Sequence, residues 1–142
     1  MKISIASDHG GLELKNKIGE YLCRQGHTVR DFGTTTLDSC DYPDFARPAA
    51  LSVAKGETER GILVCTTGIG VSMVANKVKG IRCALCVNPD MAHMTRLHNN
   101  ANVLAMGQKY VDLETAKQIV DEFLNTPFEG GRHAERVNKI ED

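Results

Sequence analysis

Short apolar runs alternate with amphipathic stretches along the chain, and this alternation limits the possible folds more than any other feature. Five runs have the length and composition of buried strands: KISIAS (2–7), TVRDF (28–32), GILVC (61–65), RCALCV (82–87) and NVLAMG (102–107). Each leads toward a stretch in which apolar residues recur every three or four positions. The pattern therefore predicts an α/β protein with a five-stranded parallel sheet covered by helices on both faces.

The helical stretches have recognisable stripes and ends. One apolar stripe comprises Leu14, Ile18, Tyr21 and Leu22, and another comprises Ala116, Ile119, Val120, Phe123 and Leu124. Pro43 and Pro89 are expected near helix starts, while Gly26, Gly56 and Gly80 are expected where helices stop. About five helices result, and an amphipathic piece, RHAERVNKI (132–140), either folds back or reaches another subunit. A chain of 142 residues fits one domain spanning 1–142.

Charge and cysteine content exclude several classes of protein. Seventeen basic and eighteen acidic side chains nearly balance, and no run of either sign indicates a nucleic-acid or membrane partner. The N-terminus reaches Asp8 and His9 too soon for a signal peptide, so we expect a cytoplasmic protein. Five cysteines then indicate reduced thiols. The CALC motif (83–86) has CxxC spacing, but in a strand its two thiols would face opposite sides, which disfavours a redox or zinc site.

Chemistry is expected at the carboxyl ends of the parallel strands. The segments there are SDHGG after the first strand, CTTGIG after the third, and NP after the fourth. Glycines alone would only permit tight turns. However, a glycine-rich turn that opens a helix also presents free N–H groups, which suit an anion or an oxyanion. Cys65 would point toward such a helix start, where a thiolate is stabilised and can act as nucleophile or base.

Three common kinds of site do not fit the sequence. A cysteine phosphatase loop would place arginine at the position of Val71, and a dinucleotide fingerprint would place glycine at the position of Met73. A metal site is improbable because His93 and His98 are five residues apart and do not share a helix face. His27 and His133 are expected at the surface.

Other polar side chains are expected to reach the same edge of the sheet. They are Asp8 and His9 from the first turn, Tyr42 after the second strand, and His98 with Asn99 from the end of the fourth helix. Arg132 and Arg136 are four residues apart, so in a helix they share one face and can clamp a phosphate. A solvated surface role explains these two arginines equally well.

Taken together, these segments resemble the ribose/galactose isomerase family, which holds type B ribose-5-phosphate isomerases and galactose-6-phosphate isomerase subunits. The resemblance runs nearly end to end through SDHGG, DYPDFA, TGIGVSMVANK, GIR, HNNANVLAMG and EGGRHAERV. It implies a Rossmann-like three-layer sandwich that assembles as a homodimer or homotetramer. It also implies active sites between subunits, with the C-terminal helix reaching toward the neighbouring chain.

The resemblance further implies a role for each matching residue. Cys65 would be the general base for an aldose–ketose interconversion, and the backbone N–H groups of Gly68, Ile69 and Gly70 would stabilise the enediolate. Ring opening would use His98 with Asp8 and Thr67, while Tyr42 and Asn99 position the sugar. His9, Lys109, Arg132 and Arg136 would hold the phosphate, with His98, Arg132 and Arg136 donated by the neighbour. This scheme requires neither a metal nor a cofactor.

Two departures from the family pattern keep alternatives open. Thr66 replaces the usual glycine after the cysteine, and it would be strained if that position needs a positive φ. Lys109 stands where many members carry arginine, so it keeps the charge but not the bidentate fork. The leading prediction is interconversion of ribose 5-phosphate and ribulose 5-phosphate. The alternatives are allose 6-phosphate, galactose 6-phosphate or a tetrose phosphate as substrate, or a catalytically silent phosphosugar-binding subunit.

Overall fold

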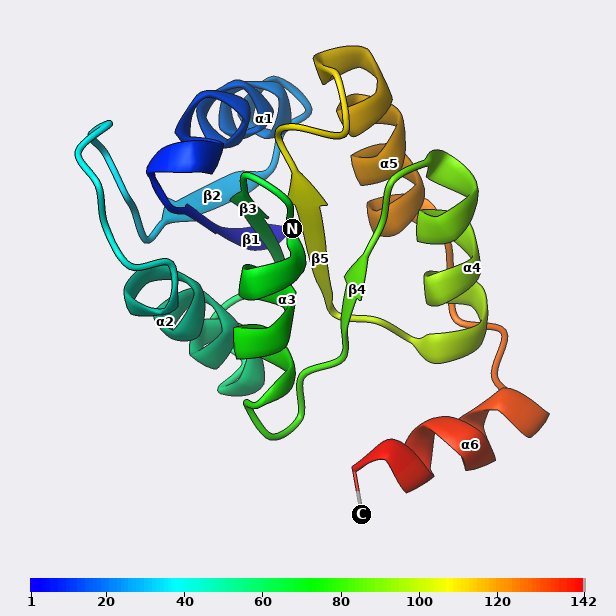
Figure 1. Cartoon of the computed structure of the whole chain (residues 1–142). Helices are drawn as coiled ribbons and strands as arrows, with labels where there is room; N and C mark the ends of the chain where they lie inside the picture. Colours follow the sequence, from blue (N-terminus) through cyan, green and yellow to red (C-terminus); the bar gives the residue numbers. More distant parts are fainter. Residues whose placement is uncertain (142) are drawn as a thin grey trace.

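The computed structural model describes residues 1–141, and its centre is a parallel β-sheet (Figure 1). Within those residues the strands are β1 (Lys2–Ser7), β2 (Thr28–Asp31), β3 (Arg60–Cys65), β4 (Cys83–Leu85) and β5 (Val103–Gly107). Their order across the sheet is β2-β1-β3-β5-β4, and every neighbouring pair is parallel. All five expected strands are confirmed. β4 is shorter at both ends than the expected strand (82–87), and Asn88, three residues after it, caps the next helix with its side chain.

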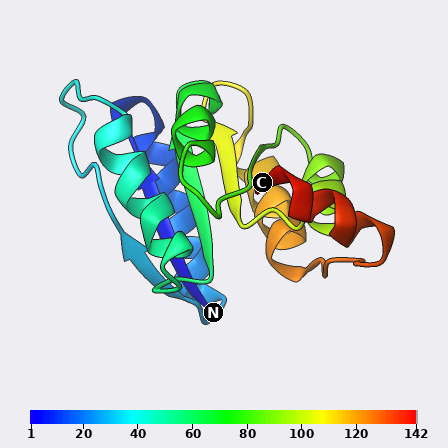
Figure 2. The same ribbon diagram turned by 90° about the horizontal axis from the view of Figure 1, so that it is seen from below.

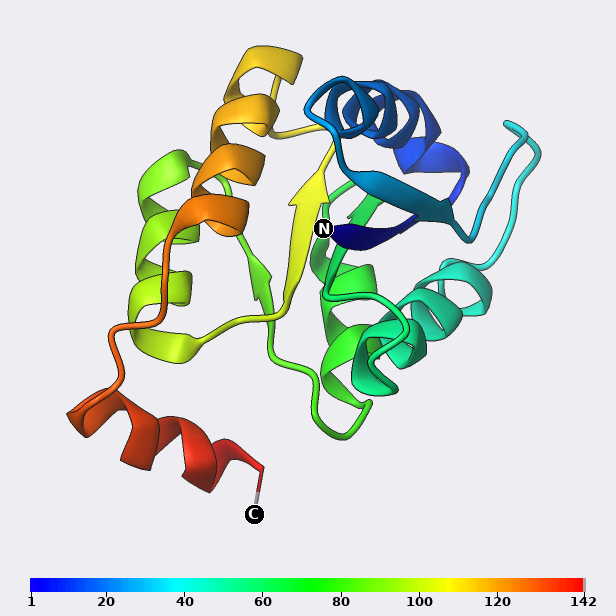
Figure 3. The same cartoon turned by 180° about the vertical axis from the view of Figure 1, so that it is seen from behind.

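Helices cover both faces of the sheet, as the sequence predicts (Figures 1 and 3). α1 (Leu12–Arg24), α4 (Pro89–Asn99) and α5 (Leu113–Asn125) pack on one face, and α2 (Pro43–Ala54) and α3 (Ile69–Asn76) pack on the other. A short 3-10 turn, η1 (His9–Gly11), precedes α1, and α6 (Arg132–Ile140) ends the described chain. The described residues thus form six α-helices rather than about five, since the final amphipathic piece is also helical. None of these helices has both the length and the apolar content to cross a membrane.

The two apolar stripes account for much of the core on the α1, α4 and α5 face. Leu14, Ile18 and Leu22 are buried against Ile3, Ile5 and Ile62, and the whole α5 stripe is buried beside them. Tyr21 differs from its neighbours on the α1 stripe, because its ring lies at the rim and its hydroxyl donates to Asp121 at 2.7 Å. That hydrogen bond raises the pKa of Tyr21 and links α1 to α5.

Most of the expected helix boundaries are confirmed. Pro43 and Pro89 are the first residues of α2 and α4. Gly26 (φ +89°) and Gly56 (φ +76°) follow the ends of α1 and α2 in the left-handed region. The expectation for Gly80 is wrong, because α3 already ends at Asn76. Two consecutive turns then carry the chain to Gly80, four residues beyond the helix.

A buried lysine fixes the connection between β2 and α2. Lys15 is 1% exposed, and its ammonium group donates to both carboxylate oxygens of Asp31 at 2.8 Å and to the Thr34 carbonyl at 2.6 Å. The Gly33 and Thr34 peptides also bond to the end of β1 through Ser7. The start of this connection is therefore held in place, and its far end delivers Cys40 and Tyr42 to the carboxyl edge of the sheet.

α6 lies at the opposite, amino edge of the sheet, away from the carboxyl ends of the strands (Figures 1 and 2). It packs against α4, and Glu141 anchors the end that follows it. One Glu141 oxygen accepts from Arg82 at 2.8 Å, and the other accepts from the Gly80 N–H at 3.1 Å. These bonds tie the C-terminal segment to the turn that enters β4.

Candidate active site

The carboxyl ends of β1 and β3 lie side by side at the point where the strand order changes direction. Ligands of open parallel sheets bind at such a point. On the β1 side, the Asp8 carboxylate accepts from the N–H groups of Gly10 at 2.9 Å and Gly11 at 3.2 Å. A side chain at Gly11 would overlap the Val64 backbone, so this glycine allows the two turns to approach each other.

Cys65 ends β3 and is 5% exposed. Its Sγ accepts from the Gly68 N–H at 3.1 Å, so the thiol lies at the start of α3, as the sequence predicts. Gly68 has φ +78° and provides no side-chain cap for α3. The remaining N–H groups of the first turn, near Gly70, are therefore available to an anion beside the thiol.

Thr67 and Tyr42 border this helix start. The Thr67 hydroxyl accepts from the Ile69 N–H at 3.2 Å, which fixes the conformation of the turn. Tyr42 precedes α2, and its ring lies so close to Gly70 that an added Cβ there would overlap it. Glycine at position 70 therefore lets an aromatic ring from α2 lie directly beside the α3 N-terminus.

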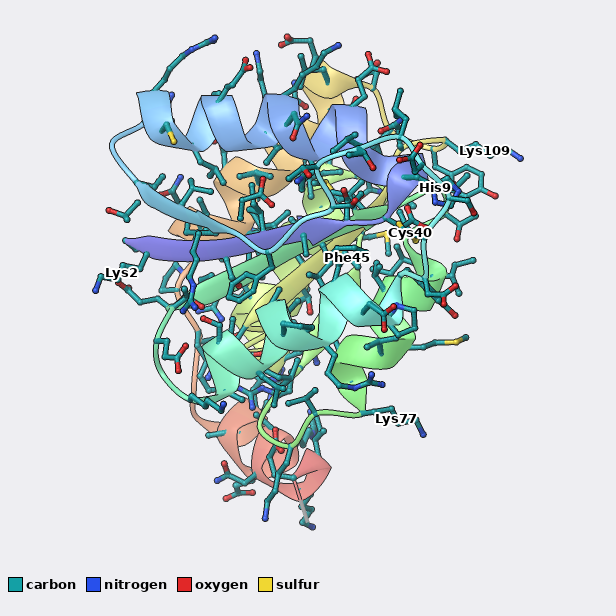
Figure 4. The ribbon with its side chains drawn as sticks, turned by 90° about the vertical axis from the view of Figure 1, so that its left-hand side faces the viewer. Lys2, His9, Cys40, Phe45, Lys77 and Lys109 are labelled. Carbon is teal, nitrogen blue, oxygen red and sulfur yellow. The ribbon has the colours of Figure 1, made fainter. Side chains whose placement is uncertain are left out.

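His9 and Lys109 bring positive or titratable groups to the same edge. Figure 4 shows His9 beside Cys40 and Lys109 on the same side of the molecule, opposite Lys2. His9 Nδ1 accepts from the Cys40 N–H at 3.2 Å, which attaches the β2–α2 connection to the first turn. The Lys109 N–H donates to the Thr66 carbonyl at 3.0 Å, and its side chain is exposed. Asp8, His9, Tyr42, Cys65, Thr67, Gly68, Ile69, Gly70 and Lys109 therefore lie together.

The expectation that the end of the fourth helix brings His98 and Asn99 to this edge is wrong for the chain itself, whereas the assignment of His98 to a neighbouring subunit stays a prediction. α4 leaves the carboxyl end of β4 and runs back along the sheet, so its last residues lie at the amino edge. There Asn99 lines a pocket with Arg82, Cys83 and Ile140. Arg132 and Arg136 lie at the same end because they belong to α6. Both are exposed and share one face of that helix, as their spacing predicts.

His133 is buried, not at the surface as the sequence suggested. Its ring stacks on His98 with centroids 4.1 Å apart, and a Glu129 oxygen lies 3.3 Å from His98 Nε2 and 3.2 Å from His133 Nε2. Burial is the main cause that lowers the pKa of His133, and the nearby His98 ring lowers this pKa further. Glu129 opposes the shift. One signal could have predicted the burial, because His133 falls on the same helical stripe as Val137.

The His98, Glu129 and His133 cluster was not expected from the sequence, and it offers three potential metal-ligand atoms within 4.8 Å of one another. Its geometry nevertheless fits an ion poorly. A metal ion lies about 2.0–2.1 Å from an imidazole nitrogen, along a lone pair in the ring plane. The two ring planes are only 11° from parallel and are stacked, so one point cannot lie in both planes. Metal binding would require one ring to rotate.

The other cysteines lack the features of a reactive pair. Cys83 and Cys86 pack on opposite faces of the sheet, as the strand pattern predicts. Burial raises the pKa of Cys86 to about 12 and that of Cys83 further still. Neither thiol is therefore prepared to ligate zinc or to exchange disulfides. All five cysteines are free within the described residues.

Thr66 fits its position without backbone strain. Among the described residues other than glycine, only Asn100 has a positive φ, so the left-handed conformation belongs to Gly68 and not to Thr66. The Thr66 side chain instead lies against Gly10, where an added Cβ would overlap its hydroxyl. Thr66 therefore joins the turn after β3 to the turn after β1 by direct contact.

Fold and site together define an α/β protein with a buried thiol at an anion-binding helix start, an arrangement suited to proton transfer on a small anionic substrate. The ribose/galactose isomerase family matches residues 3–140, and the chain belongs to that family. Ribose-5-phosphate isomerase B of Escherichia coli (strain K12) is 48% identical over 98% of this chain and 93% of its own length. A putative sugar phosphate isomerase of Bacillus subtilis (strain 168) is 48% identical over 100% and 96%.

Solved structures agree with this assignment. The ribose-5-phosphate isomerase B of Clostridium thermocellum is 53% identical, covers 99% of this chain and 95% of its own, and superimposes with a TM-score of 0.98. The Mycoplasma genitalium enzyme, solved with bound ribulose-5-phosphate, is 47% identical with a TM-score of 0.95, covering 99% and 93%. The Rossmann-like fold expected from the family resemblance is thereby confirmed.

Proposed function

We propose that this protein interconverts ribose 5-phosphate and ribulose 5-phosphate, with Cys65 as the general base. The observation that carries the proposal is the buried Cys65 thiol, which accepts from the Gly68 N–H at 3.1 Å beside the open N-terminus of α3. Aldose–ketose isomerisation needs a base and an oxyanion site next to each other. The relatives named ribose-5-phosphate isomerase B support the choice of substrate.

The chemistry follows from the geometry. The Cys65 thiolate removes the proton from C2 of the open-chain aldose, and the electron pair forms the C1–C2 double bond of an enediolate. The negative oxygen at C1 is stabilised by N–H groups of the α3 start, around Gly70. The proton on O2 moves to O1, the thiol returns its proton to C1, and C2 becomes the carbonyl carbon of the ketose, which leaves Cys65 as the thiolate again. Nothing in this sequence of steps routes a proton or electron through a metal ion.

The remaining roles need a second copy of the chain. His98 and Asn99 lie at the end of α4, next to the turn that leads into the start of β5. Cys65, in contrast, pairs with Gly107 at the end of β5. Gly61 and Cys65 are four residues apart on β3, which separates the two edges by about 13 Å before side chains are added. His98 as the ring-opening group, and Arg132 and Arg136 as phosphate ligands, would therefore come from the neighbouring subunit. Asp8, His9, Thr67, Tyr42 and Lys109 would come from the same subunit as Cys65.

A mixing experiment tests this shared site. Cys65→Ala should lower kcat by about 10²–10⁴-fold, and Arg136→Ala should chiefly raise KM. In a mixed dimer of the two variants, one site has both substitutions and the other has neither. At a substrate concentration well below the KM of the Arg136→Ala variant, where both homodimers are nearly inactive, random exchange of subunits should then restore about one quarter of wild-type activity in a symmetric dimer. Failure to restore activity after verified subunit exchange would show that each site is built from one chain.

The substrate is tested by direct assay. Purified protein in excess chelator is given ribose 5-phosphate, and ribulose 5-phosphate is measured, with allose 6-phosphate assayed alongside. Efficient pentose turnover supports the proposal and its independence from a metal. Turnover of the hexose alone would reassign the substrate. Binding of both sugars without turnover would indicate a silent phosphosugar-binding subunit.

A further inference from the structure

A carboxylate lies beside two stacked histidines where the start of α6 meets the end of α4. One Glu129 oxygen is 3.3 Å from His98 Nε2 and 3.2 Å from His133 Nε2, and the centroids of the two rings are 4.1 Å apart. His133 Nε2 is buried and forms no hydrogen bond within the described residues, so the carboxylate is not aligned with that ring alone. Glu129 is therefore shared between the two Nε2 atoms.

All three side chains are attached to the same end of α4. His98 is the last residue but one of that helix. The Glu129 N–H donates to the Leu97 carbonyl at 3.0 Å, which holds the Glu129 backbone beside His98. His133 is 7% exposed, and Val137, on the same stripe of α6, is also buried. The His98 ring therefore stacks on a fixed surface, while 35% of its side chain stays exposed.

The proposed reaction gives His98 a proton transfer, but it gives Glu129 and His133 no role. When the furanose ring of ribose 5-phosphate opens, the C1–O4 bond breaks, the C1=O1 bond forms, and one proton passes from O1 to O4. An imidazole can carry this proton only if one of its nitrogens is free and the ring is correctly oriented. A neighbouring carboxylate selects the free nitrogen, because it favours a proton on the nitrogen that it faces.

We infer that Glu129 and His133 are positioning residues for His98, an inference that rests on the proposed function. Glu129 keeps a proton on Nε2 of His98, so Nδ1 is the nitrogen that exchanges a proton with the sugar. The His133 ring restricts rotation of the His98 ring. Both residues act through His98, and they belong to the chain that lends His98 to the neighbouring site.

Isotope exchange separates ring opening from proton transfer at carbon. Ribulose 5-phosphate cannot close a five-membered ring, because its C5 oxygen carries the phosphate. In D₂O, Cys65 should therefore exchange the C1 proton of this ketose without help from His98. Glu129→Gln should lower kcat/KM for ribose 5-phosphate by about tenfold or more, while deuterium enters C1 of ribulose 5-phosphate at a rate within about twofold of wild type.

Matched variants complete the test. Glu122→Gln changes a second carboxylate that contacts a histidine of α4, His93, at 3.1 Å, and it should leave both rates unchanged. His133→Phe keeps a flat ring against His98 and should retain most of the isomerase activity. His133→Ala removes the stacked ring, so it should lower isomerisation without lowering exchange, as Glu129→Gln does.

The possible outcomes separate the inference from the proposed function. Equal losses of isomerisation and exchange in Glu129→Gln would mean that the variant perturbs the whole subunit, and no loss of either would mean that His98 acts without Glu129. Both results overturn the inference and leave the isomerase assignment intact. If an active wild type exchanges no deuterium, isomerisation of 4-deoxyribose 5-phosphate, which lacks the O4 that closes the ring, replaces exchange as the reference rate. If the wild type isomerises no pentose, the proposed function fails and the inference fails with it.

Discussion

Gly68→Ala tests why the turn beside Cys65 has a glycine at position 68: because its backbone is left-handed, or because the neighbouring atoms leave no room for a side chain. Gly68 has φ +78°, and a Cβ there would lie 2.6 Å from the Leu85 side chain and 2.7 Å from the Met106 carbonyl carbon. Gly56 has nearly the same conformation, φ +76°, but a Cβ there would contact nothing within 4 Å. Gly56→Ala is therefore a matched control that isolates the conformational cost.

The two variants should differ in a predictable way. A left-handed conformation costs an alanine about 1–2 kcal/mol, so Gly56→Ala should lower the free energy of unfolding by about that amount. Gly68→Ala carries the same cost plus about 1–3 kcal/mol for overpacking against the backbone of β5. It also displaces the N–H that contacts Cys65 Sγ, so kcat should fall markedly, while Gly56→Ala should leave kcat unchanged.

Urea denaturation at one fixed protein concentration, followed by linear extrapolation, measures both free energies. Initial rates of pentose isomerisation measure the effect on kcat. The reasoning would be refuted if both variants lost equal stability, since the crowding at Gly68 would then cost nothing. Full activity in Gly68→Ala would separately remove the Gly68 N–H from the catalytic arrangement.

Two further predictions concern buried charged and titratable groups. Lys15→Met keeps the apolar stem but leaves the Thr34 carbonyl without its donor and Asp31 without its cation, so the free energy of unfolding should fall by about 2–4 kcal/mol. Lys17 forms an exposed ion pair with Glu13 at 3.1 Å, so the control substitution Lys17→Met, measured by the same urea titration, should change this free energy by less than about 0.5 kcal/mol. Because the pKa of His133 is lowered in the folded state, its contribution to stability is present above the ordinary value of 6.5 and is lost as pH falls through 6.5 toward the folded pKa. His133→Gln should therefore flatten the decline of the thermal midpoint below that pH, and an unchanged slope would contradict the assigned shift.

The sheet was predictable because its signals are local. Runs such as GILVC are too short and too apolar for surface helices, and glycine-rich turns directly after them indicate strand-to-helix connections. The position of Cys65 at a helix start follows from the same reasoning, since the thiol ends an apolar run and TTGIG opens an amphipathic one. These inferences required no knowledge of contacts between distant residues.

What the sequence did not predict depends on distant contacts. The burial of His133 requires α6 to lie on the end of α4, and the Arg82–Glu141 pair that helps to fix α6 joins residues 59 positions apart. The error over His98 has a different origin, because the end of the fourth helix was assumed to lie at the same edge of the sheet as the strand-to-helix turns. The direction of α4 alone would have corrected it, since a helix following a strand returns to the amino edge.

The same topology explains why one chain should not suffice for the proposed reaction. A parallel sheet places every strand-to-helix turn at one edge and every helix-to-strand turn at the other, so a thiol after β3 and a histidine at the end of α4 are separated by construction. Exposed apolar residues lie on α3 and α4, between these edges: Ile69, Met73, Met91 and Met94 are 43%, 63%, 40% and 37% exposed. A symmetric pairing of two chains through exposed residues of this kind is isologous, meaning that if the first chain lends its α4 end to the second, the second lends its own to the first. Two complete sites would therefore form together, and neither would form in an isolated chain.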